Sequence, residues 1–173
     1  AQPGGVGDVV LWGRSMGAVT SLLVASTREP DVKALVLDSA FASLKSLSLD
    51  VVRRGANGVP TFLARGALRW IRGSVRDAAD FDIFDVDALR HAPECDAAAF
   101  FICAADDNFV EPSHGAAHHA AVATDLKEMC VCPGAHNTTR PRQCYARVER
   151  FLTRVLDGED LPEVEAHRDP EAD

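Results

Sequence analysis

Three side chains of this sequence have the types and the order that nucleophilic catalysis needs: Ser15, Asp107 and His136. Ser15 is the centre of a G-x-S-x-G motif that runs from Gly13 to Gly17. A serine hydroxyl becomes an effective nucleophile when an imidazole takes its proton and a carboxylate orients that imidazole. In one large class of hydrolases these groups come in the chain order serine, acid, histidine. The sequence follows that order, which points to hydrolysis through a covalent intermediate.

The residues around Ser15 predict the local structure that such a motif requires. The apolar run from Val9 to Trp12 predicts a buried strand, and residues 18–26 predict a helix. A serine between these elements is held on a strained turn that lifts its hydroxyl clear of the sheet. Side chains at Gly13 and Gly17 would crowd the crossing of strand and helix. A simple turn also explains an isolated G-x-S-x-G match, but the flanking elements favour a nucleophile.

Three further apolar segments predict strands that follow the first one. They lie at residues 34–37, 97–103 and 126–132. The alanines of 97–103 would suit a helix equally well, whereas its two phenylalanines, Ile102 and its short length favour a strand. Helical patterns cover residues 112–123 and 140–156. Strand alternating with helix is typical of an α/β fold with a mostly parallel sheet and helices on its faces.

The candidate acid and base follow the last two predicted strands. Asp107 comes after the third strand and His136 after the fourth. Because ligands bind at the carboxyl ends of the strands in open α/β sheets, we expect both to face Ser15 at one edge. Asp106 competes with Asp107 for the role of the acid, since turn chemistry explains either aspartate. His136 has the alternative interpretation of a surface turn residue.

The stretch from 41 to 92 has no convincing strand and is too long for an ordinary connection. Residues 43–53 and 61–71 within it predict helices. An insertion near the end of a sheet strand can form a cap over a site. The alternative is a helix that packs on the sheet beside a long ordered loop.

Composition bounds the class of protein. The chain has 173 residues, 47% of them hydrophobic, and a net charge of −8, which suits one domain with a core. Residues 157–173 hold eight acids and one arginine, so we expect a disordered acidic tail after a domain at 1–156. The sequence shows no basic patch for nucleic acid and no apolar run that approaches the ~20 residues of a membrane span. Peripheral membrane contact stays open, and we expect a cytoplasmic or membrane-associated protein.

The remaining residues with chemical potential receive structural interpretations. The five cysteines are odd in number and lack C-x-x-C spacing, which favours buried free thiols in a reducing compartment; Cys130 and Cys132 are predicted to lie in the core. The helix after Asp107 carries three histidines, predicted to lie on a solvated face without a metal: His114, His118 and His119. Trp12 and Trp70 are predicted to serve packing.

Several segments resemble the α/β-hydrolase superfamily, and the closest likeness is to the eukaryotic branch of α/β-hydrolase-domain proteins that includes protein depalmitoylases. The likeness is carried by Leu11–Ser21, Leu37–Phe41, Phe81–Ile83, and His136-Asn137 followed by Arg140-Pro141 and Tyr145. In this branch the acid stands three residues before an isoleucine or valine, and a Ser-His-Gly follows shortly. Val110 and Ser113-His114-Gly115 therefore select Asp107.

The resemblance implies a role for each candidate. Ser15 is the nucleophile, His136 the general base, Asp107 the acid that orients it, and the Met16 N–H one donor to the oxyanion. Relatives cleave carboxylic esters or thioesters, some remove palmitate from protein cysteines, and none needs a cofactor. The resemblance thus implies a serine hydrolase of a small-molecule or acylated-protein substrate. A peptidase of the same superfamily and a non-catalytic remnant that binds a partner are the alternatives.

The resemblance also implies that part of the fold is missing at the front. The family fold has about four strands before the strand that precedes the nucleophile, and one of their loops supplies the second oxyanion N–H. We therefore expect a partial α/β-hydrolase fold of about four strands, with flanking helices and a helical insertion. Its first strand would be an apolar sheet edge that a missing N-terminal half or a partner strand completes.

Overall fold

Four parallel strands form the centre of the molecule. The computed structural model describes residues 7–28, 31–55 and 61–158, and the predicted tail lies outside them from residue 159. The sheet has the order β1-β2-β3-β4, and every neighbouring pair is parallel. The strands are β1 (Val9–Arg14), β2 (Val32–Asp38), β3 (Ala98–Ala104) and β4 (Lys127–Cys132). Since all four run the same way, their carboxyl ends share one edge, as the sequence predicted.

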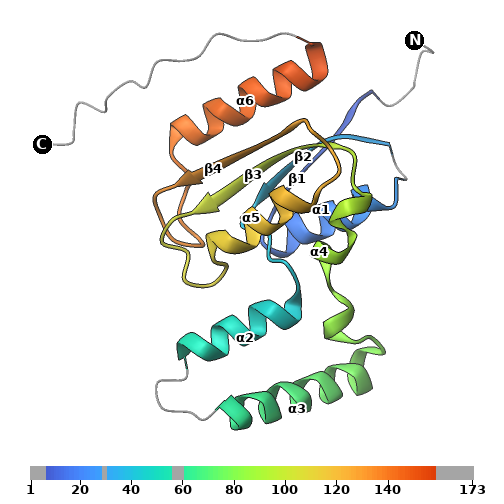
Figure 1. The fold of residues 1–173 in the computed structure, drawn as a ribbon, viewed down its shortest axis with the longest axis vertical. Coiled ribbons are helices and arrows are strands. Elements are labelled where there is room, and N and C mark those ends of the chain that lie inside the picture. The colour runs from blue at the N-terminus through green and yellow to red at the C-terminus, as the bar shows by residue number, and fades with distance from the viewer. Residues whose placement is uncertain (1–6, 29–30, 56–60, 159–173) are drawn as a thin grey trace, which may run out of the picture.

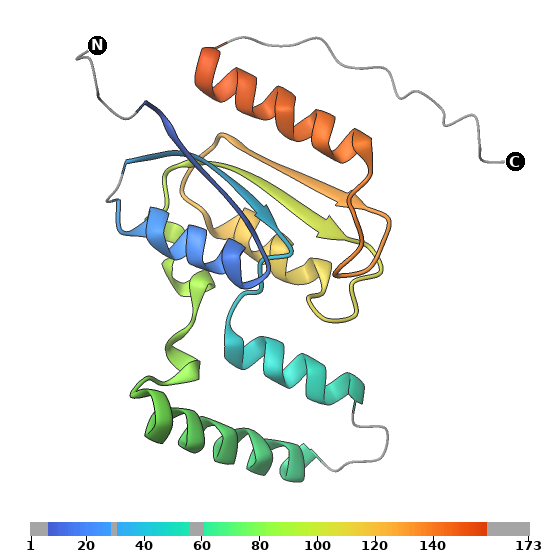
Figure 2. The ribbon, with the colours of Figure 1, turned by 180° about the vertical axis from the view of Figure 1, so that it is seen from behind.

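Helices cover both faces of this sheet (Figure 1). They are α1 (Met16–Ser26), α2 (Leu44–Gly55), α3 (Thr61–Ala79), α4 (Ala88–His91), α5 (Pro112–Ala121) and α6 (Arg142–Asp157), with short 3-10 turns η1 (Ile83–Asp85) and η2 (Ala92–Glu94). Helix α6 lies on one face, and α1 and α5 lie on the other. Helices α2 and α3 lie beyond α1 and α5, away from the sheet, in both ribbon views (Figure 2).

The two central strands are buried on both faces. Neighbouring residues of a strand point to opposite sides, so Val36 and Phe100 enter the core under α6 while Leu35 and Phe101 enter the core with α1. Phe100 meets Phe151 of α6 edge to face, with ring centroids 5.4 Å apart. Burial on both faces explains why the alanine-rich segment is a strand without hydrophobic alternation.

Strand β1 lies at the sheet edge, as the resemblance implied, and it is less buried than its apolar sequence predicted. Within the described residues it pairs with β2 alone, and its apolar side chains are only half-buried. Trp12 is 51% exposed, with its ring centroid 6.2 Å from that of Tyr145, and Trp70 of α3 is 73% exposed. The packing role holds in part for Trp12, whose ring contacts Tyr145, but not for Trp70, because α3 projects away from the sheet (Figure 1).

A close polar contact and an ion pair attach α2 of the insertion to α5. Asp50 of α2 lies 3.2 Å from His114 of α5, and Arg54 of α2 lies 2.8 Å from Glu111 at the start of α5. Helix α3 is held to the segment before η1 by Arg72, which pairs with Asp82. Residues 41–92 thus contain the two predicted helices, and α2 buries Leu47 in the core cluster that includes Leu35 and Phe101 of the sheet. A cap over the site stays a prediction.

Two of the three histidines on α5 are buried, which corrects the predicted solvated face. His114 Nδ1 accepts the backbone N–H of Ala42 at 3.2 Å, and His118 Nε2 donates to the carbonyl of Phe41 at 3.0 Å. Burial lowers the pKa of His118, although the bond to Phe41 opposes this. Both rings fix the chain where it leaves β2, and His119 is half-buried.

The cysteines agree with the prediction of buried thiols. All five are free and buried, and Cys130 and Cys132 share the face of β4 that enters the core under α6. Burial raises the pKa of Cys103 to about 12. Within the described ranges, no helix combines the length and apolar character needed to cross a membrane.

Candidate active site

Ser15 occupies a strained turn between β1 and α1. Its backbone has φ 53° and ψ −118°, in the left-handed region that non-glycine residues rarely adopt, and this costs about 1–3 kcal/mol. The turn is fixed by the Ser15 N–H, which donates to the carbonyl of Asp38 at 2.8 Å. Although Ser15 is the N-cap of α1, its side chain makes no capping hydrogen bond. The half-buried hydroxyl is therefore left available for other chemistry.

The two motif glycines are needed to different degrees. A Cβ atom at Gly13 would lie 2.3 Å from the backbone carbonyl group of Gly17, so no side chain fits there. A Cβ at Gly17 would meet nothing within 4 Å. The predicted crowding is thus correct for Gly13 and wrong for Gly17, because Gly17 is exposed on the first turn of α1 and contributes only its backbone to the crossing.

Asp107 carries a fully buried carboxylate that accepts four hydrogen bonds. The backbone N–H groups of Phe109 and Val110 donate to Oδ1 at 2.9 and 2.8 Å. Oδ2 accepts the Ser39 hydroxyl at 3.0 Å and His136 Nδ1 at 2.8 Å. Burial alone would raise the pKa of Asp107, but the hydrogen bonds from His136 and the two N–H groups hold it below its usual value. The carboxylate therefore stays ionised beside the imidazole.

Asp106 has a different position from its neighbour. It is exposed, and its Oδ2 accepts the backbone N–H of Gly134 at 3.2 Å, while its own N–H donates to the Gly134 carbonyl at 3.1 Å. These bonds join the loops that follow β3 and β4. The ring of His136 thus pairs with Asp107 and not with Asp106.

The contact with Asp107 fixes which nitrogen of His136 carries the proton. A carboxylate only accepts hydrogen bonds, so Nδ1 must donate, and Nε2 of the neutral ring is then the proton acceptor. The side chain is 14% exposed, and Phe109 packs edge to face against the ring, with centroids 5.1 Å apart. This is the tautomer that a general base for a serine requires.

The three candidate residues lie at the same edge of the sheet, but each one follows a different strand. Ser15 follows β1, Asp107 follows β3 and His136 follows β4, so β2 lies between the serine and the acid. Within residues 7–28, 31–55 and 61–158, the structure records no hydrogen bond between Ser15 Oγ and His136. Such contacts are often long in ligand-free enzymes and tighten when substrate binds.

Met16, predicted to donate to an oxyanion, directly follows Ser15 in the structure. It is the first residue of α1, where backbone N–H groups lack an intrahelical partner and the helix dipole is positive. The Ser15 N–H is already used by Asp38. The Met16 N–H is therefore the candidate oxyanion donor on the elbow, the turn at Ser15 between β1 and α1.

For three polar residues near this site, the sequence analysis predicted no role. Asp38, Ser39 and Arg140 are all buried at the end of β2 and in the loop after β4. The segments that contain them carried part of the family resemblance, but residue type and spacing did not indicate their contacts. Their burial could be found only from the fold.

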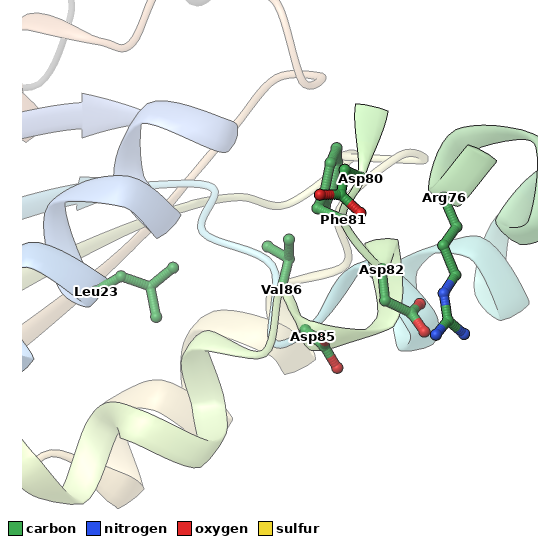
Figure 3. A pocket seen from close by; sticks show the side chains of 7 residues that line it. All are labelled: Leu23, Arg76, Asp80, Phe81, Asp82, Asp85 and Val86. Atoms are coloured by element: carbon green, nitrogen blue, oxygen red, sulfur yellow. The ribbon is translucent and has the colours of Figure 1, made fainter. Parts of the chain in front are cut away.

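A cavity of about 490 Å³ lies elsewhere, between α1 and the insertion (Figure 3). It is lined by Leu23, Arg76, Asp80, Phe81, Asp82, Asp85 and Val86. Leu23 is eight residues beyond Ser15, about 12 Å along the helix. None of Ser15, Asp107 and His136 lines the cavity, so it is separate from the candidate active site. In the described part of the chain, no three histidine, cysteine, aspartate or glutamate side chains are grouped to hold a metal ion.

Solved structures show what this arrangement is similar to. An esterase from Pyrococcus furiosus superposes with a TM-score of 0.62 at 18% identity, over 86% of this chain and 55% of its own. Acetyl xylan esterase 1 from a Thermoanaerobacterium species gives 0.57 at 21% identity, over 81% of this chain and 44% of its own. A monoacylglycerol lipase from Paleococcus ferrophilus gives 0.56 at 18% identity, over 85% and 69%.

The sequence comparisons add no closer relative. No family model matches the chain, and no curated protein matches it. The chain spans about half the length of the esterase structures described above. The parallel four-strand sheet, its flanking helices and these superpositions agree, and the chain therefore has a partial α/β-hydrolase fold.

Proposed function

We propose that this chain is a serine hydrolase that cleaves carboxylic esters or thioesters, with Ser15, His136 and Asp107 as its triad. The observation that carries the proposal is the 2.8 Å bond between His136 Nδ1 and the buried Asp107, at the sheet edge where Ser15 occupies a strained turn. Esterases and a lipase among the similar structures support the reaction class. An acylated protein is the proposed alternative to a small-molecule substrate.

The mechanism follows from the direction of the hydrogen bonds. Nε2 of His136 takes the proton of Ser15 Oγ as the oxygen attacks the acyl carbon, and Asp107 stabilises the imidazolium without accepting the proton. The imidazolium then protonates the leaving alcohol or thiol. Water, activated by the same nitrogen, attacks the acyl group on Ser15 and releases the acid.

Charge on the tetrahedral oxygen is stabilised by the start of α1. The Met16 N–H donates to it, and each such donor is worth about 10²–10³ in rate. A second donor in this fold comes from a loop that precedes the elbow strand.

A fluorophosphonate probe tests the proposal, because it reacts with an activated serine whatever the natural acyl group is. We expect one label per chain on Ser15, no label in Ser15→Ala, and loss of p-nitrophenyl butyrate hydrolysis in the same variant. Ser21, on the exposed side of α1 with its hydroxyl bonded to the Gly17 carbonyl at 2.9 Å, provides the matched control. Ser21→Ala should label normally.

A non-catalytic domain that binds a partner is the second candidate, favoured by the position of β1. This strand forms one edge of the described sheet and carries the exposed Trp12. Folded protein that takes no label on Ser15 would support this candidate and exclude the hydrolase.

A further inference from the structure

A buried arginine holds the loop that carries His136. Arg140 lies four residues after the histidine, and its side chain has no exposed surface. Its guanidinium donates to three backbone carbonyls of this loop: Ala135 at 2.9 Å, His136 at 3.3 Å and Thr138 at 3.4 Å. The connection between β4 and α6 is thus folded around one planar cation.

The other side of the same guanidinium is anchored at the end of β2. Nε and Nη2 of Arg140 donate to Asp38 Oδ1 at 3.0 and 2.8 Å. Asp38 also pairs at 2.7 Å with Arg14, the residue before Ser15. The Asp38 carbonyl accepts the Ser15 N–H at 2.8 Å. Asp38 therefore joins the turn that carries Ser15 to the loop that carries His136.

A third bond reaches the candidate acid. Nη2 of Arg140 donates to Ser39 Oγ at 3.1 Å, and a guanidinium has no acceptor to offer in return. The Ser39 hydroxyl proton is then free to point to Asp107 Oδ2, 3.0 Å away. That oxygen also accepts a hydrogen bond from His136 Nδ1. Arg140 is thus linked to Asp107 through Ser39 and to His136 through its backbone carbonyl.

We propose that Arg140 is a positioning residue that sets His136 in register with Ser15 by clamping the histidine loop to Asp38. The proposal rests on the proposed function of Ser15 and His136. Strands β2 and β3 separate β4 from β1, so the sheet ladder alone does not fix this loop against the elbow. Apolar side chains can replace a buried ion pair without loss of stability. The buried guanidinium of Arg140 donates both to the end of β2 and to the loop that carries His136. Its presence is thus better explained by the geometry that it imposes on this loop than by added stability.

Arg140→Lys is the main test, since it keeps the charge near Asp38 but cannot hold three carbonyls with a planar fork. We expect fluorophosphonate labelling of Ser15 to slow by about 10²-fold, because a misplacement of about 1 Å is enough for such a loss. For p-nitrophenyl butyrate, kcat should fall while KM stays unchanged. Arg147→Lys is the matched control: Arg147 donates to the Met129 carbonyl at 3.1 Å, away from the site, and its loss should leave labelling unchanged.

A second measurement needs no turnover. The low-field NMR signal of the His136 Nδ1 proton should be sharp in the wild type and in Arg147→Lys, and broadened by solvent exchange in Arg140→Lys. Thermal melting identifies variants that do not fold. Where Arg140→Lys fails to fold, Asp38→Asn replaces it, because it removes the charged anchor and leaves the three carbonyl bonds in place.

The outcomes separate the two proposals. Slower labelling together with a broadened signal supports the positioning role of Arg140, and wild-type behaviour of either quantity in a folded variant overturns it. If the wild type takes no label, the proposed function fails. The NMR signal then tests by itself whether Arg140 holds His136 against Asp107, and a sharp signal in Arg140→Lys overturns that part of the proposal.

Discussion

Asparagine at position 107 would reverse the polarity of the hydrogen bond to His136. Two backbone N–H groups, from Phe109 and Val110, point at Oδ1 of Asp107, so the amide oxygen of an asparagine must occupy that place. The amide NH₂ then stands where Oδ2 now accepts His136 Nδ1. Because the NH₂ group only donates, Nδ1 must become the acceptor, and the proton moves to Nε2.

The size of the effect follows from this change of tautomer. With a proton on Nε2, the ring can no longer accept the proton of Ser15. The same exchange of carboxylate for amide in a serine protease triad lowers kcat by about 10⁴-fold, which is about 5 kcal/mol of transition-state stabilisation. We expect a loss of that order in kcat for Asp107→Asn, with KM for p-nitrophenyl butyrate nearly unchanged.

Asp106→Asn is the matched control for this assay. Asp106 is adjacent in sequence, but among the described residues its side chain accepts the Gly134 N–H alone, which an amide oxygen can also accept. Activity should stay within a factor of about two, since exposed substitutions of this kind cost less than about 0.5 kcal/mol. Equal losses in the two variants, or less than a tenfold loss in Asp107→Asn, would refute the assignment of Asp107.

Other variants and titrations test the elbow and the buried charges. Gly13→Ala should destabilise the fold by at least about 1–3 kcal/mol, whereas Gly17→Ala should change it by less than about 0.5 kcal/mol, as measured by thermal melting; equal effects would contradict the elbow geometry. Since the pKa of Asp107 lies below its usual 3.8, its ionised form stabilises the fold above that pH, and this contribution is lost as the pH falls through the lowered value. Urea midpoints below about pH 4 should therefore fall less steeply in Asp107→Asn than in the wild type. Because burial lowers the pKa of His118 below 6.5, unfolding takes up a proton and stability should decline as the pH falls below that value; a His118 ring that titrates by NMR near 6.5 would contradict its burial.

The sequence was sufficient for the parts of the site that depend on local pattern. The glycine motif between an apolar run and a helix predicts the turn at Ser15, and the strand-to-loop boundaries place Asp107 and His136 at the same edge. Such features follow from backbone geometry and from the rule that parallel strands share their carboxyl edge. The choice between Asp106 and Asp107 needed the family resemblance, because neighbouring residues in a turn point in different directions.

The contacts that cross the fold were out of reach of pattern alone. Arg140 and Asp38 meet across 102 positions of sequence, and an isolated arginine predicts an exposed side chain. His114 and His118 were predicted to lie on a solvated helix face, yet the chain that leaves β2 packs over them. The edge position of β1 was predicted from the resemblance, but it was not used to predict that Trp12 is exposed.

The central claim is that Ser15 carries the acyl group during turnover. Acid quenching during p-nitrophenyl butyrate hydrolysis, followed by mass spectrometry of the peptides, measures this directly. We predict a butyryl group on the peptide that contains Ser15 in the wild type, and none in His136→Ala. Hydrolysis that depends on the folded protein but leaves Ser15 unmodified, or a butyryl group on another residue, would contradict the account.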